Sequence, residues 1–263
     1  MTKNNGVDVA ILCGGFGSRL KPVVADRAKP MADVGGVPFL SLLIDEVAAF
    51  GFRRFVLCVG HLAGSVESHQ WKREDGTSIV FSREKRPLGT AGAVRNAAGK
   101  LCGDTVLVLN GDSICRMNYR KFLAFHLAQK ARATIAVSRM QLSGDYGEVV
   151  VGWAGVINAF REKTRKDRKG WVNAGVYAFD ASVLKELPAR VPLSLERDVF
   201  PEMVGKGLVA FRTRSTFLDI GTPERYALAR GRLSSGAGSF TSGGRGWKSE
   251  RPLDRGRQLT ADN

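Results

Sequence analysis

The amino-acid sequence predicts an α/β fold with an open, mixed, mostly parallel β-sheet flanked by helices. From residue 7 to residue 140, short apolar runs of strand length alternate with longer amphipathic runs, which is the pattern of consecutive βαβ units. The chain has 263 residues, 44% of them hydrophobic, which is enough to bury one sizeable core. We therefore expect one folded domain at residues 1–233 and a tail at residues 234–263.

The first half of the chain is expected to build the parallel part of the sheet. Runs rich in Val, Ile, Leu and Phe indicate strands, at residues 7–15, 52–60, 78–84, 105–112 and 133–140. Apolar residues at helical spacing indicate helices, at residues 38–50, 63–71, 90–101 and 119–130. Because such sheets bind ligands at the carboxyl ends of their strands, the residues that follow the strands are the candidates for chemistry.

The pattern becomes hairpin-like after residue 141. Strand pieces are expected at residues 146–152, 155–163 and 171–180, followed by a helical segment at 194–207 and a last strand and turn at 215–224. From Ser234 onward the chain is rich in Gly and Ser and lacks apolar periodicity, so we expect a disordered tail.

Composition argues against several classes of protein. The four cysteines, Cys13, Cys58, Cys102 and Cys115, lack CxxC or CxH spacing, so free thiols in a reducing compartment fit better than disulfides or a metal cluster. With three histidines, a histidine-rich metal site is not expected. The apolar run at residues 9–13 is too short for a signal peptide or a membrane span. We expect a cytoplasmic protein without a membrane partner.

The net charge of +15 indicates an anionic partner, although a basic surface that serves only solubility is an equal reading. The partner could be nucleic acid, an acidic membrane or a phosphorylated small molecule. The tail carries five basic and three acidic residues, so most of the excess belongs to the domain. The basic segments lack stacking aromatic residues, and no helix-turn-helix, zinc or RNA-recognition pattern occurs, so no nucleic acid partner is expected.

A glycine-rich loop follows the first expected strand. Gly14, Gly15 and Gly17 can let backbone N–H groups approach an anion, and Arg19 and Lys29 would add the positive charge that a triphosphate needs. By itself this pattern also fits an ordinary glycine turn. Its spacing is neither GxGxxG nor GxxxxGK[ST], so it indicates neither a dinucleotide site nor a P-loop.

The segment LCGGFGSRLKPVVADRAKPM resembles the signature of sugar nucleotidyltransferases, which usually reads L-(A/C)-GG-x-GTRL followed by PKP. Ser18 replaces the usual Thr, and Ala28 replaces the first Pro, which we expect to loosen the loop that presents Lys29. The resemblance implies that Arg19 holds the triphosphate and that Lys29 meets the phosphates where the new bond forms. The nucleotide-binding residues that it implies here are Leu12, Gly14, Gly15, Gly17 and Ser18.

Two acidic residues, Asp112 and Asp219, each follow a strand-like run and precede or follow a glycine turn. A carboxylate at the end of a buried strand can hold Mg²⁺ against phosphates, although a single one is more often a turn or cap residue. In the resembling family these two positions bind one Mg²⁺ together. The resemblance thus implies Mg²⁺ as the cofactor, both aspartates as its ligands, and Asp112 as a catalytic residue with Arg19 and Lys29.

The segment SREKRPLGTAGAVRNA resembles the part of the family that lies along the base, with Pro87, Gly89 and Thr90 as nucleotide-binding residues. Family members that use thymidine or uridine nucleotides often carry Gln where this chain has Glu84. A carboxylate can only accept hydrogen bonds, and guanine offers two adjacent donors, so Glu84 favours GTP. The alternative is that Glu84 is a solvent-facing partner of Lys85 or Arg86.

The family's sugar-binding segments follow in order as YGEV, FREK, NAGVY and SLERDVFP. The sugar-phosphate-binding residues that they imply are Gly147, Glu162, Lys163, Asn173 and Glu196. For Glu162 and Lys163, the alternative is a solvated run of charges. No repeat follows the DIGTPE segment, so a stand-alone transferase is expected.

The resemblance covers about residues 7 to 233 and is strongest to D-glycero-D-manno-heptose-1-phosphate guanylyltransferases, through CGGFGSRL, EKRPLGTAGA, VLNGD, NAGVY and DIGTPE. It implies a Rossmann-like fold and the transfer of GMP from GTP to a sugar 1-phosphate, with release of pyrophosphate. The alternatives are the same reaction with mannose 1-phosphate and GTP, or with UTP or dTTP and a hexose or amino sugar 1-phosphate. A basic nucleic-acid-binding protein is a remote alternative, and a homo-oligomer is left open.

Overall fold

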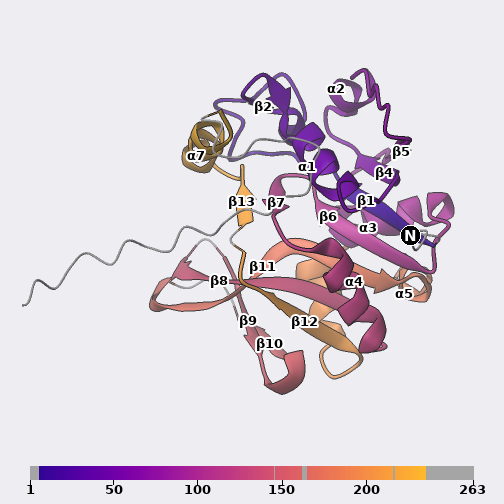
Figure 1. Cartoon of the computed structure of the whole chain (residues 1–263), viewed down its shortest axis with the longest axis vertical. Helices are drawn as coiled ribbons and strands as arrows, with labels where there is room; N and C mark the ends of the chain where they lie inside the picture. The colour runs from indigo at the N-terminus through magenta and orange to yellow at the C-terminus, as the bar shows by residue number, and fades with distance from the viewer. Residues whose placement is uncertain (1–5, 145, 162–164, 216, 235–263) are drawn as a thin grey trace, which may run out of the picture.

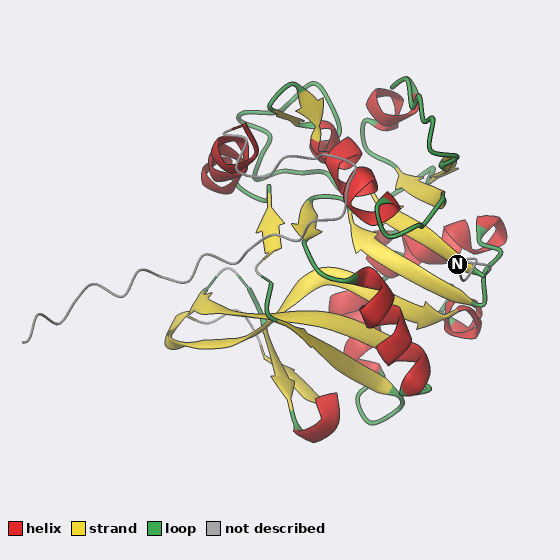
Figure 2. Ribbon diagram, in the orientation of Figure 1, coloured by secondary structure: helices red, strands yellow, loops and turns green. Residues whose placement is uncertain are grey.

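The computed structural model describes residues 6–144, 146–161, 165–215 and 217–234, and it confirms the α/β class. Figures 1 and 2 show the sheet running through the molecule with helices packed along it. The strands are β1 (Val7–Leu12), β2 (Asp33–Val34), β3 (Val37–Pro38), β4 (Arg54–Val59), β5 (Ser78–Arg83), β6 (Thr105–Asn110), β7 (Ser113–Cys115), β8 (Ala133–Ser143), β9 (Glu148–Val151), β10 (Ile157–Arg161), β11 (Arg165–Asp180), β12 (Leu208–Thr213) and β13 (Phe217–Asp219).

The helices are α1 (Phe39–Ala48), α2 (Ala63–Glu67), α3 (Gly89–Ala97), α4 (Tyr119–Ala128), α5 (Ala181–Glu186), α6 (Phe200–Glu202) and α7 (Pro223–Ser234). Short helical turns are η1 (Lys29–Met31), η2 (Ala98–Lys100), η3 (Trp153–Gly155) and η4 (Leu195–Val199). In this part of the chain, no helix is both long and apolar enough to cross a membrane.

The main sheet is mixed, as the sequence predicts. Its central path runs β10-β9-β11-β6-β1-β4-β5. The strands β6, β1, β4 and β5 are parallel, whereas β11 pairs antiparallel with β6 and with β8, and β12 adds to β8 in parallel. The alternating pattern therefore predicts the four parallel strands correctly, whereas the strand expected at residues 133–140 differs, because β8 pairs antiparallel with β11 and is parallel only to β12.

Both faces of the parallel strands are buried, because helices cover both sides. Along β1, Val9 and Ile11 belong to one apolar cluster together with residues of α1, while Ala10 belongs to a second cluster together with residues of α3. Successive side chains of a strand point to opposite faces, so a strand buried on both sides is apolar throughout. This explains the unbroken apolar run in the sequence.

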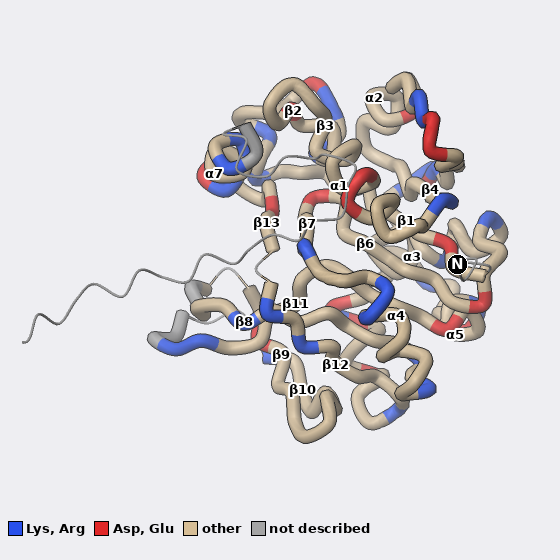
Figure 3. Tube along the Cα trace, in the orientation of Figure 1, with Lys and Arg blue, Asp and Glu red and all other residues tan. Residues whose placement is uncertain are grey.

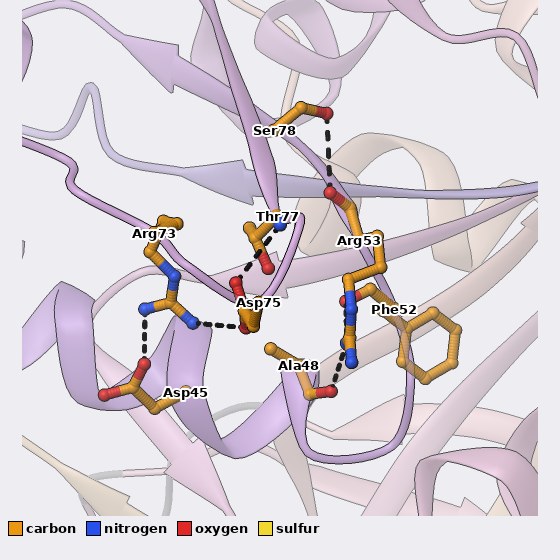
Figure 4. A network of polar contacts seen from close by, with 8 residues as sticks. All are labelled: Asp45, Ala48, Phe52, Arg53, Arg73, Asp75, Thr77 and Ser78. Carbon is orange, nitrogen blue, oxygen red and sulfur yellow. Dashed lines mark hydrogen bonds and ion pairs between the residues drawn. The ribbon is translucent and has the colours of Figure 1, made fainter.

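The loop after α2 is tied back to α1 by an arginine (Figure 4). Arg73 donates to Asp45 of α1 and, at 3.0 Å, to Asp75 in its own loop. Burial acts to raise the pKa of Asp75, but hydrogen bonds from Arg73 and Thr77 outweigh this effect and lower the pKa to about 2. The helix expected at residues 63–71 accordingly ends at Glu67, and ion pairs rather than helical bonds hold the loop that follows.

Six of the described strands and α-helices were not expected from the sequence: β2, β3, β7, β12, α5 and α7. The helix α7 lacks an apolar stripe, so its sequence carries a weak helical signal. It packs through the buried Ala229 and through the Tyr226 hydroxyl, which donates to Asp33 O at 2.5 Å. The residues Thr222 and Pro223 at its start are a cap-like pair that could have indicated it.

The cysteines and the basic residues are distributed as follows. All four cysteines are free thiols, and Cys13, Cys58 and Cys115 are buried.

Figure 3 shows Lys and Arg positions on many described elements, among them α4, α7 and β8, so the basic excess is spread over the domain. The expected tail, apart from Ser234, lies outside the described residues.

Candidate active site

The site lies where β1, β4 and β6 end side by side. Leu12 pairs with Cys58 on one side and with Asn110 on the other. The loops that follow stay in contact, since Cys13 N donates to Cys58 O at 2.8 Å, Gly111 N to Leu12 O at 3.0 Å, and His61 N to Gly14 O at 3.2 Å. Three loops thus meet at the carboxyl edge of the sheet, as this sheet type requires.

The glycine loop after β1 presents exposed groups at this edge. Gly15, Ser18 and Arg19 are exposed, and Leu12 is partly buried. Gly17 lies against Lys29, because a Cβ added at Gly17 would come within 3.1 Å of the Lys29 Cβ. The loop therefore brings the backbone of residues 14–17 and the side chain of Lys29 together.

Lys29 is firmly placed, in contrast to the expectation of a loosened loop. It begins η1, and the preceding Ala28 is buried and donates its N–H to Ser65 Oγ at 2.9 Å. A proline at this position would have no N–H to donate. The hydrogen bond to α2 thus anchors the loop where the usual proline is missing.

The Lys29 ammonium contacts Asp112 directly. Its Nζ lies 2.5 Å from Asp112 Oδ2, and the two side chains are 12% and 35% exposed. Asp112 follows β6 and precedes β7, which pairs antiparallel with β13. Next to this two-stranded ladder, Ile220 N donates to Asp112 O at 3.0 Å. This bond brings Asp219, the residue before Ile220, beside Asp112.

Asp219 accepts hydrogen bonds on both carboxylate oxygens. Gly221 N donates to Oδ1 at 2.9 Å, Arg225 Nη1 lies 3.2 Å from Oδ1, and the Tyr146 hydroxyl donates to Oδ2. Arg19 also lies nearby, since its Nη2 would be 3.8 Å from a Cβ added at Gly221. The structure thus gathers Arg19 and Asp219 with Lys29 and Asp112.

Sequence reasoning gave no role to Tyr146 or Arg225. The tyrosine lies directly before Gly147 in the YGEV segment, so its place in that segment was a usable signal. Arg225 lies in α7, which the sequence did not predict, and only the fold brings it to Asp219.

Glu84 lies over two glycines at the end of the parallel strands. A Cβ on Gly14 would be 2.7 Å from Glu84 Oε1, and one on Gly60 would be closer still. The other oxygen, Oε2, accepts the Leu88 N–H at 3.2 Å. Burial raises the pKa of the Glu84 carboxyl, and the bond from Leu88 opposes this shift. The side chain therefore points toward the glycine loop, while Lys85, Arg86 and Pro87 are exposed.

A polar network connects α3 with β11. Thr90 Oγ1 donates to Glu196 Oε2 at 3.0 Å, and the Tyr177 hydroxyl donates to Glu196 Oε1 at 3.2 Å. Asn173 Nδ2 donates to the Tyr177 oxygen at 2.8 Å. Burial and the charge of Glu196 raise the pKa of Tyr177 well above its ordinary value. Asn173, Thr90 and Glu196 therefore form one continuous group of hydrogen bonds.

Two polar atoms beside this network are buried and have no hydrogen-bond partner in the described part of the chain. They are Asn110 Oδ1 and Ser113 Oγ, which flank Asp112 in sequence. Both side chains border Gly175, where an added Cβ would lie 2.6 Å from Ser113 Oγ and 3.0 Å from Asn110 Nδ2. Unpaired buried oxygens are costly, so these two are candidates to contact a substrate or water.

The remaining sugar-side candidates are only partly described. Gly147 lies close to the next strand, since its added Cβ would be 3.1 Å from Arg161 O. Glu162 and Lys163 lie outside the described residues.

Glu148, the residue after Gly147, is held ionised by two arginines. Burial acts to raise the pKa of Glu148, but hydrogen bonds from Arg168 and Arg161 keep that pKa below its ordinary value.

Among the residues that the structure describes, no group of three or more His, Cys, Asp and Glu side chains is placed to hold a metal ion. Asp112 and Asp219 are two carboxylates, which is the number that Mg²⁺ often takes from a protein, with substrate and water supplying the other oxygens. Each of them already holds a cationic group, Lys29 or Arg225, so the pair attracts positive charge. The donor set therefore fits Mg²⁺.

Known proteins resemble this chain in fold and in sequence. A family model described as nucleotidyl transferase matches residues 9–235. The crystal structure of HddC from Yersinia pseudotuberculosis, complexed with GMP-PN, has a TM-score of 0.76 and 31% sequence identity, covering 86% of this chain and 98% of that one.

Two curated relatives are similar over most of this chain. Mannose-1-phosphate guanylyltransferase of Mycobacterium tuberculosis is 33% identical, covering 84% of this chain, which spans 62% of that protein. D-glycero-alpha-D-manno-heptose 1-phosphate guanylyltransferase of Aneurinibacillus thermoaerophilus is 32% identical, covering 86% of this chain and 98% of its own length. Together with the match over residues 9–235, these relatives show that the chain belongs to the nucleotidyl transferase family.

Proposed function

We propose that this protein transfers GMP from GTP to a sugar 1-phosphate and releases pyrophosphate. The observation that carries the proposal is the position of Glu84, whose Oε1 faces the same glycine loop that carries Gly14 and Arg19. A base that lies along this loop would meet a carboxylate that can only accept hydrogen bonds. Guanine has two adjacent donors, N1–H and N2–H₂, for such a carboxylate.

The transfer needs no nucleophile from the protein. A sugar 1-phosphate is mostly dianionic near neutral pH, since its second pKa is about 6, and one of its oxygens can attack the α-phosphorus of GTP. A new P–O bond forms there, the bond from the α-phosphorus to the bridging oxygen breaks, and pyrophosphate leaves with that electron pair. Arg19 and Lys29 would stabilise the negative charge that accumulates.

Asp112 and Asp219 are proposed to hold Mg²⁺. When bound, Mg²⁺ would neutralise charge on the phosphate oxygens and so favour attack at phosphorus. Lys29, which contacts Asp112 at 2.5 Å in this structure, would exchange that contact for a substrate phosphate.

The proposed sugar is D-glycero-D-manno-heptose 1-phosphate, with mannose 1-phosphate as the second candidate. The heptose relative matches over 98% of its length, whereas this chain spans 62% of the mannose relative. The two identities are nearly equal, so sequence similarity supports both sugars. The network around Asn173 and Glu196 supplies the hydrogen-bonding groups that sugar hydroxyls need.

The experiment is pyrophosphate release with each of five nucleoside triphosphates against both sugar phosphates. We expect GTP to be preferred. Glu84→Gln places an amide against a guanine donor and loses a charge-assisted bond, so the preference for GTP over UTP should fall by about 10-fold to 100-fold. Glu67→Gln is the control, because Glu67 lies in α2 and pairs with Arg83 at 3.3 Å.

The outcome that contradicts the assignment of guanine is an unchanged nucleotide ranking in Glu84→Gln, or a wild-type protein that prefers UTP. Absence of pyrophosphate release with all pairs would remove the transferase proposal itself.

A further inference from the structure

The carboxylate of Asp219 is already paired with a cation of this chain. Arg225 Nη1 lies 3.2 Å from Oδ1 and 3.4 Å from Oδ2 of Asp219. The two side chains are only 18% and 12% exposed, so water screens this ion pair less than a surface pair. An incoming divalent cation would therefore meet a carboxylate whose charge is compensated and whose two oxygens are both in use.

The helix α7 and the ring of Tyr146 place Arg225 beside Asp219. Arg225 lies in the first turn of α7, where its backbone N–H donates to Thr222 Oγ1 at 3.4 Å. Its Cζ lies 4.5 Å from the centre of the Tyr146 ring, within the range of a cation–π contact. The same tyrosine donates its hydroxyl to Asp219 Oδ2. Arg225 is thus positioned by a ring that also contacts the carboxylate.

Arg225 also borders Arg19, the residue that we assign to the triphosphate. A Cβ added at Gly221 would lie 3.7 Å from Arg225 Nη1 and 3.8 Å from Arg19 Nη2. The same added Cβ would lie 2.7 Å from Asp219 Oδ1, so this one carboxylate lies beside both guanidinium groups and offsets their mutual repulsion. A phosphate bound by Arg19 would bring a further anion, and would give Arg225 a second negative partner within reach.

We propose that Arg225 is an exchangeable counter-ion, which occupies Asp219 until the nucleotide arrives. Without nucleotide, Arg225 competes with a divalent cation for the carboxylate. When a triphosphate binds at Arg19, the guanidinium moves to a phosphate oxygen and Asp219 becomes available to the metal. By linkage, nucleotide and metal then strengthen each other's binding by the same factor. This inference rests on the proposed function, and it makes Arg225 a positioning residue.

Arg225 is the better residue for a test than Lys29, although Lys29 pairs with Asp112 in a similar way. Lys29 is assigned to the reacting phosphates, so its variants would change catalysis directly. Arg230 offers a matched control, because it lies on the same helix, is exposed, and stacks over Tyr226 at 5.8 Å. Replacing either arginine by Gln removes one positive charge from α7.

The test measures Mn²⁺ binding by the electron paramagnetic resonance signal of free Mn²⁺, for the full chain with and without GTP. Without GTP, Arg225→Gln should bind Mn²⁺ about 10-fold more tightly than wild type, the scale on which an adjacent charge changes the proton affinity of a carboxylate. The factor by which GTP strengthens Mn²⁺ binding should fall in this variant. Arg225→Lys, which keeps the charge, and Arg230→Gln should both behave like wild type.

The proposal is overturned if Arg225→Gln binds Mn²⁺ as weakly as wild type, or more weakly, in the absence of GTP. It is also overturned if Arg225→Lys matches Arg225→Gln, because the charge would then not be the cause. Another variant distinguishes failure of this proposal from failure of the metal site itself. If Asp219→Asn binds Mn²⁺ as wild type does in the presence of GTP, the assignment of Asp219 to the metal fails, and this inference fails with it.

Discussion

Individual side chains of the candidate site depend on partners that lie far away in the sequence. Lys29 contacts Asp112 across 83 positions, and Tyr146 contacts Asp219 across 73. Each contact places a charged or polar group at the edge where the parallel strands end. The role that we assign to each side chain therefore depends on the fold that brings its partner close.

Removal of either proposed metal ligand tests the site at this scale. We expect Asp112→Ala and Asp219→Ala each to lower Mg²⁺-dependent pyrophosphate release by at least about 100-fold, the scale of losing one electrostatic contact to a transition state. Thermal unfolding should show that both variants remain folded. Asp26→Ala, an exposed residue that pairs with Arg27, is the control. Full activity in either site variant would remove that residue from the metal site.

His126 makes the stability of the domain depend on pH. Its ring Nδ1 lies 2.8 Å from Thr134 Oγ1, and both residues are buried. Burial lowers the pKa of His126 from 6.5, and the charge of Asp180 opposes this shift only in part. Below pH 6.5 the unfolded chain therefore binds a proton that the folded chain resists, so folding stability falls as the pH falls.

We expect the free energy of unfolding in urea to be smaller at pH 5.5 than at pH 7.5. The difference between the two pH values should shrink in His126→Gln, which cannot titrate, and should persist in His61→Gln, where the replaced ring is exposed. An equal pH dependence in wild type and His126→Gln would show that other groups cause it.

Among the elements, α3 shows how one residue sets the start of a helix at the site. Gly89 begins α3 with a φ of +76°. A Cβ there would lie 2.5 Å from Leu193 O. The backbone of residues 91 and 92 donates to the same carbonyl, at 2.9 and 3.2 Å. The helix can therefore approach the segment that carries Glu196 only because residue 89 has no side chain.

Gly89→Ala should destabilise the protein, because it forces a side chain into a left-handed backbone conformation and against a carbonyl. We expect a loss of roughly 1–3 kcal/mol in the free energy of unfolding. Gly99→Ala is the matched control, since an added Cβ there meets nothing within 4 Å. Thermal and urea unfolding measure both variants, and a Gly89→Ala protein as stable as wild type contradicts the steric argument.

At the scale of the whole molecule, we expect the domain to function without the residues beyond α7. Residues 235–263 lie outside the described part of the chain, and their sequence lacks apolar periodicity. The family match ends at residue 235. The boundary between the domain and the tail stays a prediction.

Deletion of residues 234–263 should leave kcat and the KM values for both substrates nearly unchanged, because a segment without apolar content has little to pack against the domain. Steady-state pyrophosphate release compares the truncated and the full chain. A large loss of activity would mean that the tail contacts the site or another copy of the chain. Sedimentation of both proteins would distinguish these two causes.

The sequence by itself determined the α/β class and the succession of strands and helices along the first half of the chain, because apolar periodicity is a local property and reflects burial directly. It also placed the candidate residues Gly14, Lys29, Asp112 and Asp219, since they follow strands or belong to motifs that resemble a family. Those assignments of role remain proposals.

The tertiary structure alone decided which of these groups meet. It showed that Ala28 donates to Ser65 where the family has a proline, that Glu84 points toward the glycine loop, and that Arg225 pairs with Asp219. Such contacts join residues from separate elements, and α7 lacks the apolar stripe that would have indicated a helix in the sequence. Periodicity cannot indicate them, because a contact energy between distant residues exists only once the chain has folded.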